Sequence, residues 1–364
     1  MNTLLNRMVA AAVMLVAAGN TLALQFNLSM VRTDVCPVEP ADTIAEGEWM
    51  EGTPMPTPRS EIASAVLEGR IYVAGGIVEQ FEGATAFEVY DPQTDAWEEA
   101  APLPVGLHHA GMAADDQRVY IGGGYTSLDF NVDVSALWAY DPETNRWEQI
   151  AEMPYPRAAH TMAVIDGKLY VVGGVGQDST VLWVYDLETN AWDTSRASLP
   201  TAREHLASAV VDGKLYVIGG RWSGQGNLST LEVYDPQADS WERLAEIPTP
   251  RGGLTAAAVN GLIHVTGGEA FNPDCTFNRH EVYDPQTDRW RALPDLPTPR
   301  HGLTSASVDG KWYVIGGATG AGSQTLETLS DAVHIFTPAA VPAKGKLHQI
   351  YSFLAARSAF AHRR

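Results

Sequence analysis

Short apolar runs that end in paired glycines recur along this chain. The clearest is Leu169 to Gly173 (LYVVG), a continuous apolar run typical of a β-strand buried on both faces. Helical periodicity is absent between these runs. The glycine pairs that close them are Gly75–Gly76, Gly123–Gly124, Gly173–Gly174, Gly219–Gly220, Gly267–Gly268 and Gly316–Gly317. The pattern therefore predicts an all-β chain built from a repeated group of strands.

Two further markers share the spacing of the glycine pairs, which is about 50 residues. Tyr-Asp pairs follow five of the glycine pairs, and a tryptophan follows each Tyr-Asp. The tryptophans are Trp49, Trp97, Trp147, Trp192, Trp241 and Trp290, and the tyrosines are Tyr90, Tyr140, Tyr185, Tyr234 and Tyr283. Because three markers keep one order and one period, we interpret the chain as six repeats.

Each repeat is predicted to contain four short antiparallel strands. In the third repeat, residues 157–165 form the first strand, and Asp166-Gly167-Lys168 is a tight turn that needs a residue with positive φ. Residues 169–173 and 181–185 form the next two strands, and Trp192 begins the fourth. The pattern predicts one small sheet for each repeat.

The ends of the repeat region predict how the sheets close into a ring. The sixth repeat has strands within residues 300–317 and 332–336 but no tryptophan after them. Residues 46–52 carry Trp49 and have no preceding strands of their own. We expect this segment to supply the fourth strand of the last sheet, which removes two open sheet edges.

The glycine pair, the Tyr-Asp and the Trp at this period resemble Kelch repeats over residues 47–338. The resemblance implies a six-bladed β-propeller of the bacterial secreted or periplasmic type. It also implies that the glycines allow strands to approach near the axis and that the aromatic residues pack between blades.

The N-terminus is typical of a secretory signal peptide. Arg7 precedes the apolar run Met8 to Ala18, which is too short to span a bilayer as a mature helix. Small residues follow, so cleavage after Gly19 or Ala23 is expected, with an uncleaved anchor as the alternative. We divide the chain into a signal peptide (1–23), a lead-in (24–45), the propeller (46–338) and a basic tail (339–364).

Secretion or export to the periplasm permits disulfides, and the chain has two cysteines, Cys36 and Cys275. Their spacing does not decide whether they pair. No later segment is apolar enough to span a membrane, and we expect a monomer. The net charge of −20 disfavours nucleic acid, because an acidic body repels phosphate backbones.

An arginine recurs just before the first strand of five repeats, with Leu107 in its place in the second. One interpretation is a cationic rim around the mouth of the central channel that binds an anionic or sugar ligand. The other is that each arginine holds its own loop through backbone carbonyls, which we favour because a repeated residue usually serves the repeat. The five are Arg59, Arg157, Arg203, Arg251 and Arg300.

Histidines and acids next to these arginines do not repeat strictly, so they are better candidates for a specific role. They are Glu61, His108, His109, His160, Glu204, His205 and His301. Trp222 and Phe271 lie in variable loops, where they either stack on a sugar ring or pack within their own loops. The pair His108-His109 would need partners from other blades to bind a metal, and we expect neither a metal nor a cofactor.

No sequence motif identifies a reaction: the chain lacks metalloprotease, serine-hydrolase and phosphate-loop signatures. The first hypothesis is a binding module that presents its variable loops to a glycan or a protein. The alternative is a sugar-acid epimerase or mutarotase, with Glu61, Glu204, His205 and His301 available for proton transfer. A copper radical oxidase is less favoured, because neither cysteine offers the required cross-linked Cys-Tyr.

Overall fold

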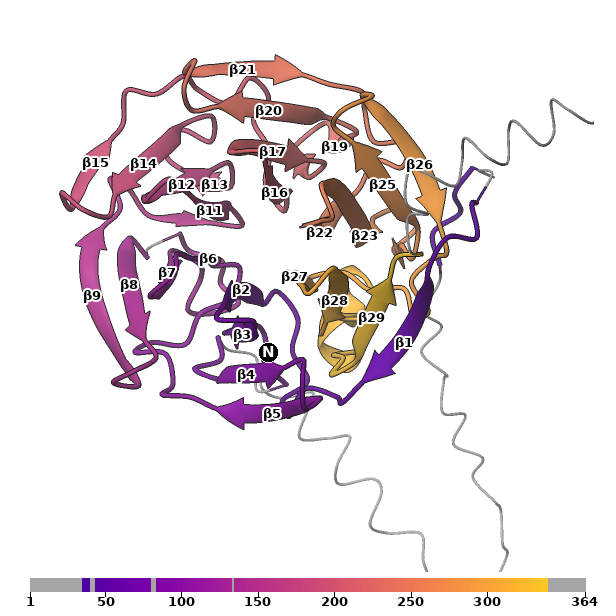
Figure 1. Cartoon of the computed structure of the whole chain (residues 1–364), viewed down its shortest axis with the longest axis horizontal. Coiled ribbons are helices and arrows are strands. Elements are labelled where there is room, and N and C mark those ends of the chain that lie inside the picture. The colour runs from indigo at the N-terminus through magenta and orange to yellow at the C-terminus, as the bar shows by residue number, and fades with distance from the viewer. Residues whose placement is uncertain (1–34, 40–42, 80–82, 133, 340–364) are drawn as a thin grey trace, which may run out of the picture. The chain divides into compact units, whose positions relative to one another are not determined.

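The computed structural model describes residues 35–39, 43–79, 83–132 and 134–339. Within them, six antiparallel sheets stand around a central axis and form a six-bladed β-propeller (Figure 1). The predicted signal peptide and nearly all of the predicted basic tail lie outside the described residues. No helix in the described part of the chain is long and apolar enough to span a membrane.

Every blade has four main strands in a meander, with the first strand innermost. Blades 1 and 2 contain β2 (Ala63–Leu67), β3 (Arg70–Ala74), β4 (Phe87–Asp91) and β5 (Ala96–Glu99), then β6 (Gly111–Ala114), β7 (Val119–Gly122), β8 (Ala136–Asp141) and β9 (Arg146–Glu152). Blades 3 and 4 contain β11 (Thr161–Ile165), β12 (Lys168–Val172), β14 (Leu182–Asp186) and β15 (Ala191–Asp193), then β16 (Ala207–Val211), β17 (Lys214–Ile218), β20 (Leu231–Asp235) and β21 (Ser240–Arg243).

Blade 5 contains β22 (Gly252–Val259), β23 (Leu262–Ala270), β25 (His280–Asp284) and β26 (Arg289–Leu293), and β24 (Cys275–Thr276) pairs with β23. Blade 6 contains β27 (Thr304–Val308), β28 (Lys311–Ile315), β29 (Val333–Thr337) and, as its outermost strand, β1 (Glu48–Gly52). Trp49 of β1 lies opposite Phe336 of β29. The ring therefore joins the first described strand to the last.

The tryptophans hold neighbouring blades together, since the core lies between blades. Each packs on the Tyr of its own blade, as Trp241 does on Tyr234 with ring centroids 5.1 Å apart, except that Trp49 packs on Phe336. The Nε1–H of Trp241 also donates to the carbonyl of Ala197 in the preceding blade, at 2.8 Å. Trp49, Trp97, Trp147 and Trp290 make the equivalent bond.

The first strand of the third blade differs from the sequence expectation. A single strand over 157–165 was predicted, but β10 (Arg157–Ala158) pairs separately with β13 (Val175–Gly176). The break lies at Ala159, whose φ of 53° is left-handed and ends the extended backbone. The predicted Asp166-Gly167 turn is confirmed, with φ of 49° and 70° at these residues.

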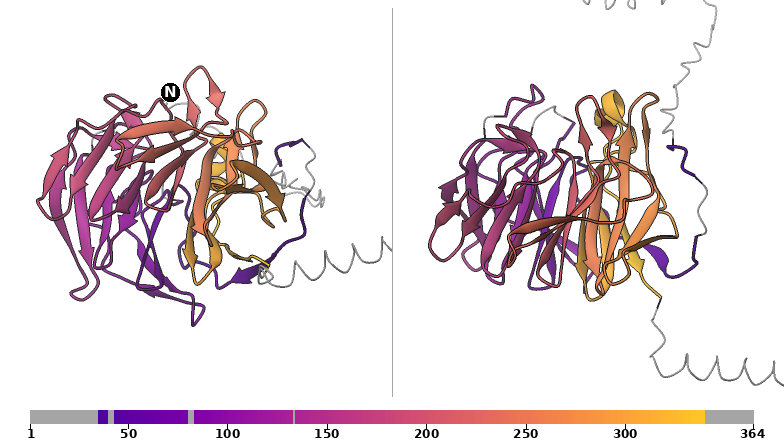
Figure 2. Two further views of the ribbon diagram at one scale, coloured as in Figure 1. Left: turned by 45° about the horizontal axis from the view of Figure 1, so that its top comes forward. Right: turned by 90° about the horizontal axis from the view of Figure 1, so that it is seen from above.

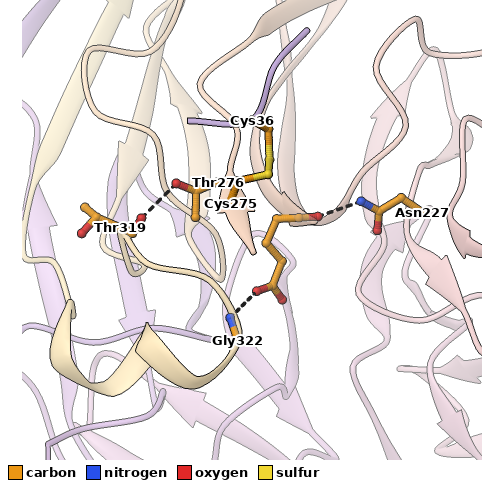
Figure 3. Close-up of a disulfide and its surroundings, with 7 residues drawn as sticks. Cys36, Asn227, Cys275, Thr276, Thr319 and Gly322 are labelled. Carbon is orange, nitrogen blue, oxygen red and sulfur yellow. Dashed lines mark hydrogen bonds between the residues drawn. A yellow bond between two sulfur atoms is a disulfide. The ribbon is translucent and has the colours of Figure 1, made fainter. Parts of the chain in front are cut away.

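The described residues of the lead-in, 35–39 and 43–45, contact blade 5 and are covalently attached to it. Cys36 and Cys275 form a disulfide (Figure 3). The Cys36 amide also donates to the carbonyl of Thr276 at 2.9 Å. Farther along, the amide of Ile44 donates to Ala292 of β26 at 3.1 Å. The lead-in thus connects the β24 loop to β1.

Two short elements stand on the rim that carries the strand-two-to-three and blade-to-blade loops, which we call the variable-loop face. They are the hairpin of β18 (Arg221–Trp222) with β19 (Gly226–Asn227), and the 3₁₀ helix η1 (Gly322–Glu327). In the right-hand view of Figure 2, η1 is the short yellow helix at one edge of the ring.

Candidate functional site

The five repeated arginines are buried: each has 0% exposure. Arg203 donates to the carbonyls of Thr201 and Val217, at 2.9 and 3.1 Å. Arg157 likewise donates to the carbonyls of Gly173, Gln177 and Asp178. The interpretation of these side chains as an accessible cationic rim is therefore wrong, because their guanidinium groups are buried and donate to backbone carbonyls of their own blades.

Each buried arginine meets a residue at one position of the third strand, two places before the Tyr or Phe. In blades 1, 4 and 5 this residue is a glutamate: Glu88, Glu232 or Glu281, each 2.5 to 2.6 Å from its arginine. In blade 3 it is Trp183, whose ring centroid lies 4.2 Å from the Arg157 guanidinium carbon. In blade 2, where leucine replaces arginine, the residue is Trp138.

Two residues beyond each arginine position, the backbones of all six blades join in a ring of hydrogen bonds around the channel. The amide at this position donates to the carbonyl at the same position of the preceding blade, at 2.6 to 3.1 Å. All six residues have left-handed φ, between 51° and 68°. We call this ring the belt, and it consists of Glu61, His109, Ala159, His205, Gly253 and Gly302.

The belt brings three functional side chains from three blades together. Glu61, His109 and His205 each place a ligand-type atom within 4.8 Å of the others. Nε2 of His109 lies 3.3 Å from Oε2 of Glu61, and the two imidazole centroids are 4.7 Å apart. Left-handed backbone is unfavourable for Glu and His, and such strain is typical of functional positions.

His301 and Glu269 extend this cluster toward blades 5 and 6. Nδ1 of His301 lies 3.4 Å from Glu61 and 3.5 Å from Glu269, and Nε2 lies 3.0 Å from the carbonyl of Gly320. Burial lowers the pKa of His301, but Glu269 and Glu61 outweigh it, so this pKa is raised. The two carboxylates therefore favour the protonated form of His301.

The pKa values of Glu61, His109 and His205 are all lowered, unlike that of His301. Burial raises the pKa of Glu61, but His109, His301 and His205 together bring it well below its usual range. Burial lowers the pKa of His109, an effect that Glu61 only partly offsets. Burial, reinforced by Arg221, lowers the pKa of His205 well below its ordinary value. At neutral pH the two belt imidazoles are uncharged.

Neighbouring side chains orient the belt imidazoles. Nδ1 of His109 lies 2.6 Å from Nδ1 of His108, whose Nε2 lies 3.1 Å from the carbonyl of Ser127. Nδ1 of His205 pairs with the Glu204 carboxylate. Glu204 in turn accepts from Nε of Arg221 at 2.9 Å, and Arg221 also donates to Glu269 at 2.6 Å.

Below the belt, the central channel is lined by hydroxyl groups of the innermost strands. Ser64 and Thr304 lie 2.6 Å apart, and Thr255 and Ser305 lie 2.8 Å apart. The cavity has a volume of about 190 Å³. His160 also lines it, but neither ring nitrogen has a hydrogen-bond partner among the described residues, and burial lowers its pKa to about 3.

A second, larger hollow opens on the variable-loop face between blades 4 and 5, and we call it the groove. Its volume is about 610 Å³, and its lining includes Arg221, Trp222, Asn227 and Phe271. Phe271 is 44% exposed, and the Arg221 guanidinium carbon lies 5.0 Å from its ring centroid. Both predicted aromatic candidates therefore face one hollow instead of packing within separate loops.

Glu269 fastens the walls of this groove to one another. Its backbone carbonyl accepts from the side chain of Asn227 in blade 4 at 2.7 Å, and its carboxylate accepts from the amide of Gly322 at 3.1 Å (Figure 3). Thr276 donates to the carbonyl of Thr319 at 2.9 Å. With the Cys36–Cys275 disulfide, these bonds hold the β23–β24 loop in place.

Of the predicted site residues, the structure groups Glu61, Glu204, His205 and His301 at the channel mouth, with His108 directly behind His109. His160 lies apart from them in the channel. Sequence reasoning placed His109 among the histidines beside the arginines and Arg221 in a variable loop, without giving either a specific role, and it did not name Glu269. Superposing the repeats at the position two residues after each arginine would have grouped His109 with Glu61 and His205, whereas Arg221 and Glu269 lie in loops with no repeated signal.

Comparison with known proteins agrees with this architecture. A family model described as the KLHDC2/KLHL20/DRC7 Kelch-repeats domain matches residues 42–174 and 150–317. The solved structure of YjhT is similar with a TM-score of 0.65 and 19% sequence identity, covering 77% of this chain and 95% of that chain. At this identity the likeness concerns the fold alone. No curated protein matches the sequence.

Proposed function

Since this chain belongs to the Kelch-repeat family, we propose that it is an extracytoplasmic binding protein that takes a glycan in the groove between blades 4 and 5. Kelch propellers are typical interaction modules, and loops carry the function of such scaffolds. The observation that carries the proposal is the pair of aromatic residues, Trp222 and Phe271, that line one hollow on the variable-loop face.

The chemistry of the groove suits a sugar. Aromatic rings offer apolar faces to the C–H groups of a sugar ring, and a few placed polar groups fix its orientation. Arg221 is already paired with Glu204 and Glu269, so it is a hydrogen-bond donor with little net charge to offer. We therefore favour a glycan whose recognition does not depend on its own negative charge.

The proposed location outside the cytoplasm rests on two features. The sequence begins with a segment typical of a signal peptide, and Cys36 and Cys275 form a disulfide. Disulfides persist in oxidising compartments and are rare in the cytosol. Treating the chain as secreted or periplasmic is consistent with both features.

The experiment is a thermal-shift screen of the full chain against glycans, followed by titration of each hit. A ligand that binds only the folded state raises the melting temperature. For such a hit, Trp222→Ala and Phe271→Ala should each weaken binding at least about tenfold, equivalent to about 1.4 kcal/mol.

The matched control is Tyr155→Ala, because Tyr155 is similarly exposed, at 46%, but does not line the groove. It should bind the same glycan as the unaltered chain does. If no glycan shifts the melting temperature, and a protein captured from the native source depends on Trp222 and Phe271, the ligand class proposed here is wrong and the groove is a protein-binding surface.

A sugar-acid isomerase is the second candidate. The observation in its favour is that Glu204 and Arg221 line the groove and also contact the titratable cluster, Glu204 through His205 and Arg221 through Glu269. A bound sugar would therefore lie beside groups that transfer protons. Anomer exchange followed by NMR, faster with the unaltered chain than with Glu204→Gln, would support this activity.

A further inference from the structure

The belt imidazoles present lone pairs to a common point. The Ser127 carbonyl can only accept, so the hydrogen of His108 is on Nε2. His108 is fully buried with no carboxylate partner, so it is neutral and its Nδ1 is an acceptor. The Nδ1 of His109 must then be the donor between the two rings, which leaves Nε2 of His109 with a lone pair.

The same reasoning applies to His205. Its Nδ1 faces a carboxylate oxygen of Glu204, which can only accept, so the hydrogen of this neutral ring is on Nδ1. Its Nε2 carries the lone pair and makes no hydrogen bond with any described residue. His109 is therefore anchored through Nδ1–H, and His205 is held by the contact of its Nδ1 with Glu204. Neither Nε2 donates a hydrogen bond to a described residue, which is how metal-binding histidines are commonly held.

The carboxylate of Glu61 is a third potential ligand beside the two imidazoles. Oε2 of Glu61 lies 3.3 Å from Nε2 of His109, so two electron-pair donors face each other with no hydrogen between them. Two ligands at tetrahedral angles around Zn²⁺ are separated by about 3.4 Å, given metal–ligand bonds of about 2.1 Å. A cation between the two atoms removes their repulsion and accounts for this spacing.

We propose that Glu61, His109 and His205 form a binding site for one divalent transition-metal ion, of which Zn²⁺ is the representative. Two imidazoles and one carboxylate are a common ligand set for Zn²⁺ and Fe²⁺, and they leave a coordination position for water or a ligand. The three ligand atoms lie within 4.8 Å of one another and come from three blades.

The surrounding residues hold these ligands in place. His108 orients His109, and Glu204, itself held by Arg221, orients His205. The belt fixes the backbone of all three ligands through its closed ring of hydrogen bonds. Such a pre-organised set needs little rearrangement to bind an ion.

The neighbouring group of Glu61, Glu269 and His301 does not make an equivalent site. Nε2 of His301 faces the Gly320 carbonyl, and Nδ1 faces two carboxylates, so both nitrogens carry hydrogens. His301 therefore offers no lone pair. Its positive charge and that of Arg221 offset most of the negative charge of Glu61, Glu204 and Glu269. The net charge that remains is small and negative, so one divalent cation does not create a large excess of positive charge.

This site is distinct from the aromatic residues of the groove, so it does not rest on the proposed glycan binding. The test uses the full chain, produced without a polyhistidine tag, stripped with EDTA and titrated with Zn²⁺. Zinc content after gel filtration and the affinity by calorimetry are measured, and Co²⁺ is added to a second sample for its absorption spectrum. One Zn²⁺ per chain and a four- or five-coordinate Co²⁺ spectrum are expected.

Three variants remove the ligands: His109→Gly, His205→Gly and Glu61→Gln. Glycine keeps the left-handed backbone, as Gly253 and Gly302 already do in the belt. Each variant should bind Zn²⁺ at least about 100-fold more weakly, since changes to outer residues alone cost about 10- to 100-fold. The matched control is His160→Gln, which alters another buried histidine of the channel and should keep full affinity.

Melting curves without metal establish that each variant is folded. The proposal is overturned if the unaltered chain retains no stoichiometric Zn²⁺ or Co²⁺. It is equally overturned if the three folded ligand variants bind as tightly as the unaltered chain does. Loss of Zn²⁺ binding with glycan binding intact would separate this site from the groove.

Discussion

At the scale of single residues, the guanidinium groups of the repeated arginines are buried in every blade that has one, but their partners differ from blade to blade. A guanidinium taken out of water needs its charge balanced and its five hydrogens bonded. Blades 1, 4 and 5 use a glutamate and backbone carbonyls, whereas blade 3 uses the face of Trp183 and carbonyls alone. Blade 2 avoids the charge altogether with Leu107 and Trp138.

Arg203→Ala should destabilise the fold strongly, because it leaves the Glu232 carboxylate buried without its partner. Breaking a buried ion pair costs about 3–5 kcal/mol. Urea unfolding of the full chain, followed by tryptophan fluorescence, measures the change in the free energy of unfolding.

Two comparisons make this prediction specific. Arg243→Ala removes an exposed ion pair with Glu246 and should change the free energy of unfolding by less than about 1 kcal/mol. The double variant Arg203→Leu/Glu232→Trp reproduces the Leu107 and Trp138 pair of blade 2 and should recover part of the loss. A stable Arg203→Ala protein with weakened glycan binding would instead make this arginine a ligand residue.

At the scale of structural elements, the belt separates the loops of the variable-loop face from the innermost strands. The residue with left-handed φ ends the extended backbone that enters each blade, which is why the predicted strand over 157–165 stops at Ala159. Glycine meets this requirement at Gly253 and Gly302 without strain. Glu61, His109 and His205 meet it at a cost, which is consistent with a functional role.

The two belt glycines should differ in their tolerance of a methyl group. A Cβ at Gly253 has no heavy atom closer than 3.5 Å, so Gly253→Ala should cost only the left-handed backbone, about 1–2 kcal/mol. A Cβ at Gly302 lies 2.6 Å from Oε1 of Glu61 and clashes with Oγ of Ser60. Gly302→Ala should therefore cost about 1–3 kcal/mol more.

Chemical denaturation of the two variants, which share one backbone conformation, isolates the steric part of this difference. Equal stabilities would contradict the close packing of Gly302 against Glu61.

At the scale of the whole molecule, two devices tie the start of the described chain to its end. Strand β1 completes blade 6, and the disulfide joins the lead-in to the β24 loop of blade 5, across 239 residues of sequence. The same loop forms a wall of the groove. The disulfide thus links the attachment of the lead-in to the shape of the proposed ligand site.

Cys36→Ser/Cys275→Ser should lower the free energy of unfolding by about 2–4 kcal/mol, because the cross-link restricts the unfolded chain. Calorimetry with and without dithiothreitol measures this effect. The reductant should lower the melting temperature of the unaltered chain and leave that of the double variant unchanged. The six blades should remain folded in both cases, since no blade strand depends on the disulfide alone.

The sequence by itself determined the architecture, because the fold repeats. Six copies of a glycine pair, a Tyr-Asp and a Trp reinforce one another, and local strand and turn signals suffice to define each blade. The same repetition explains why the arginines were recognised as a set. The sequence did not determine where the arginine side chains point, since a side chain just before a strand is able to face either the channel or its own loop.

Only the tertiary structure decided the candidate sites. Glu61, His109 and His205 stand 48 and 96 residues apart in sequence and meet because the ring is closed. Arg221 and Glu269 belong to loops without a repeated signal, and their pairing depends on how two neighbouring blades are placed. The pairing of Cys36 with Cys275 likewise depends on the path of the lead-in along blade 5. Strand patterns are local, whereas a site assembled from several blades exists only once the propeller has closed.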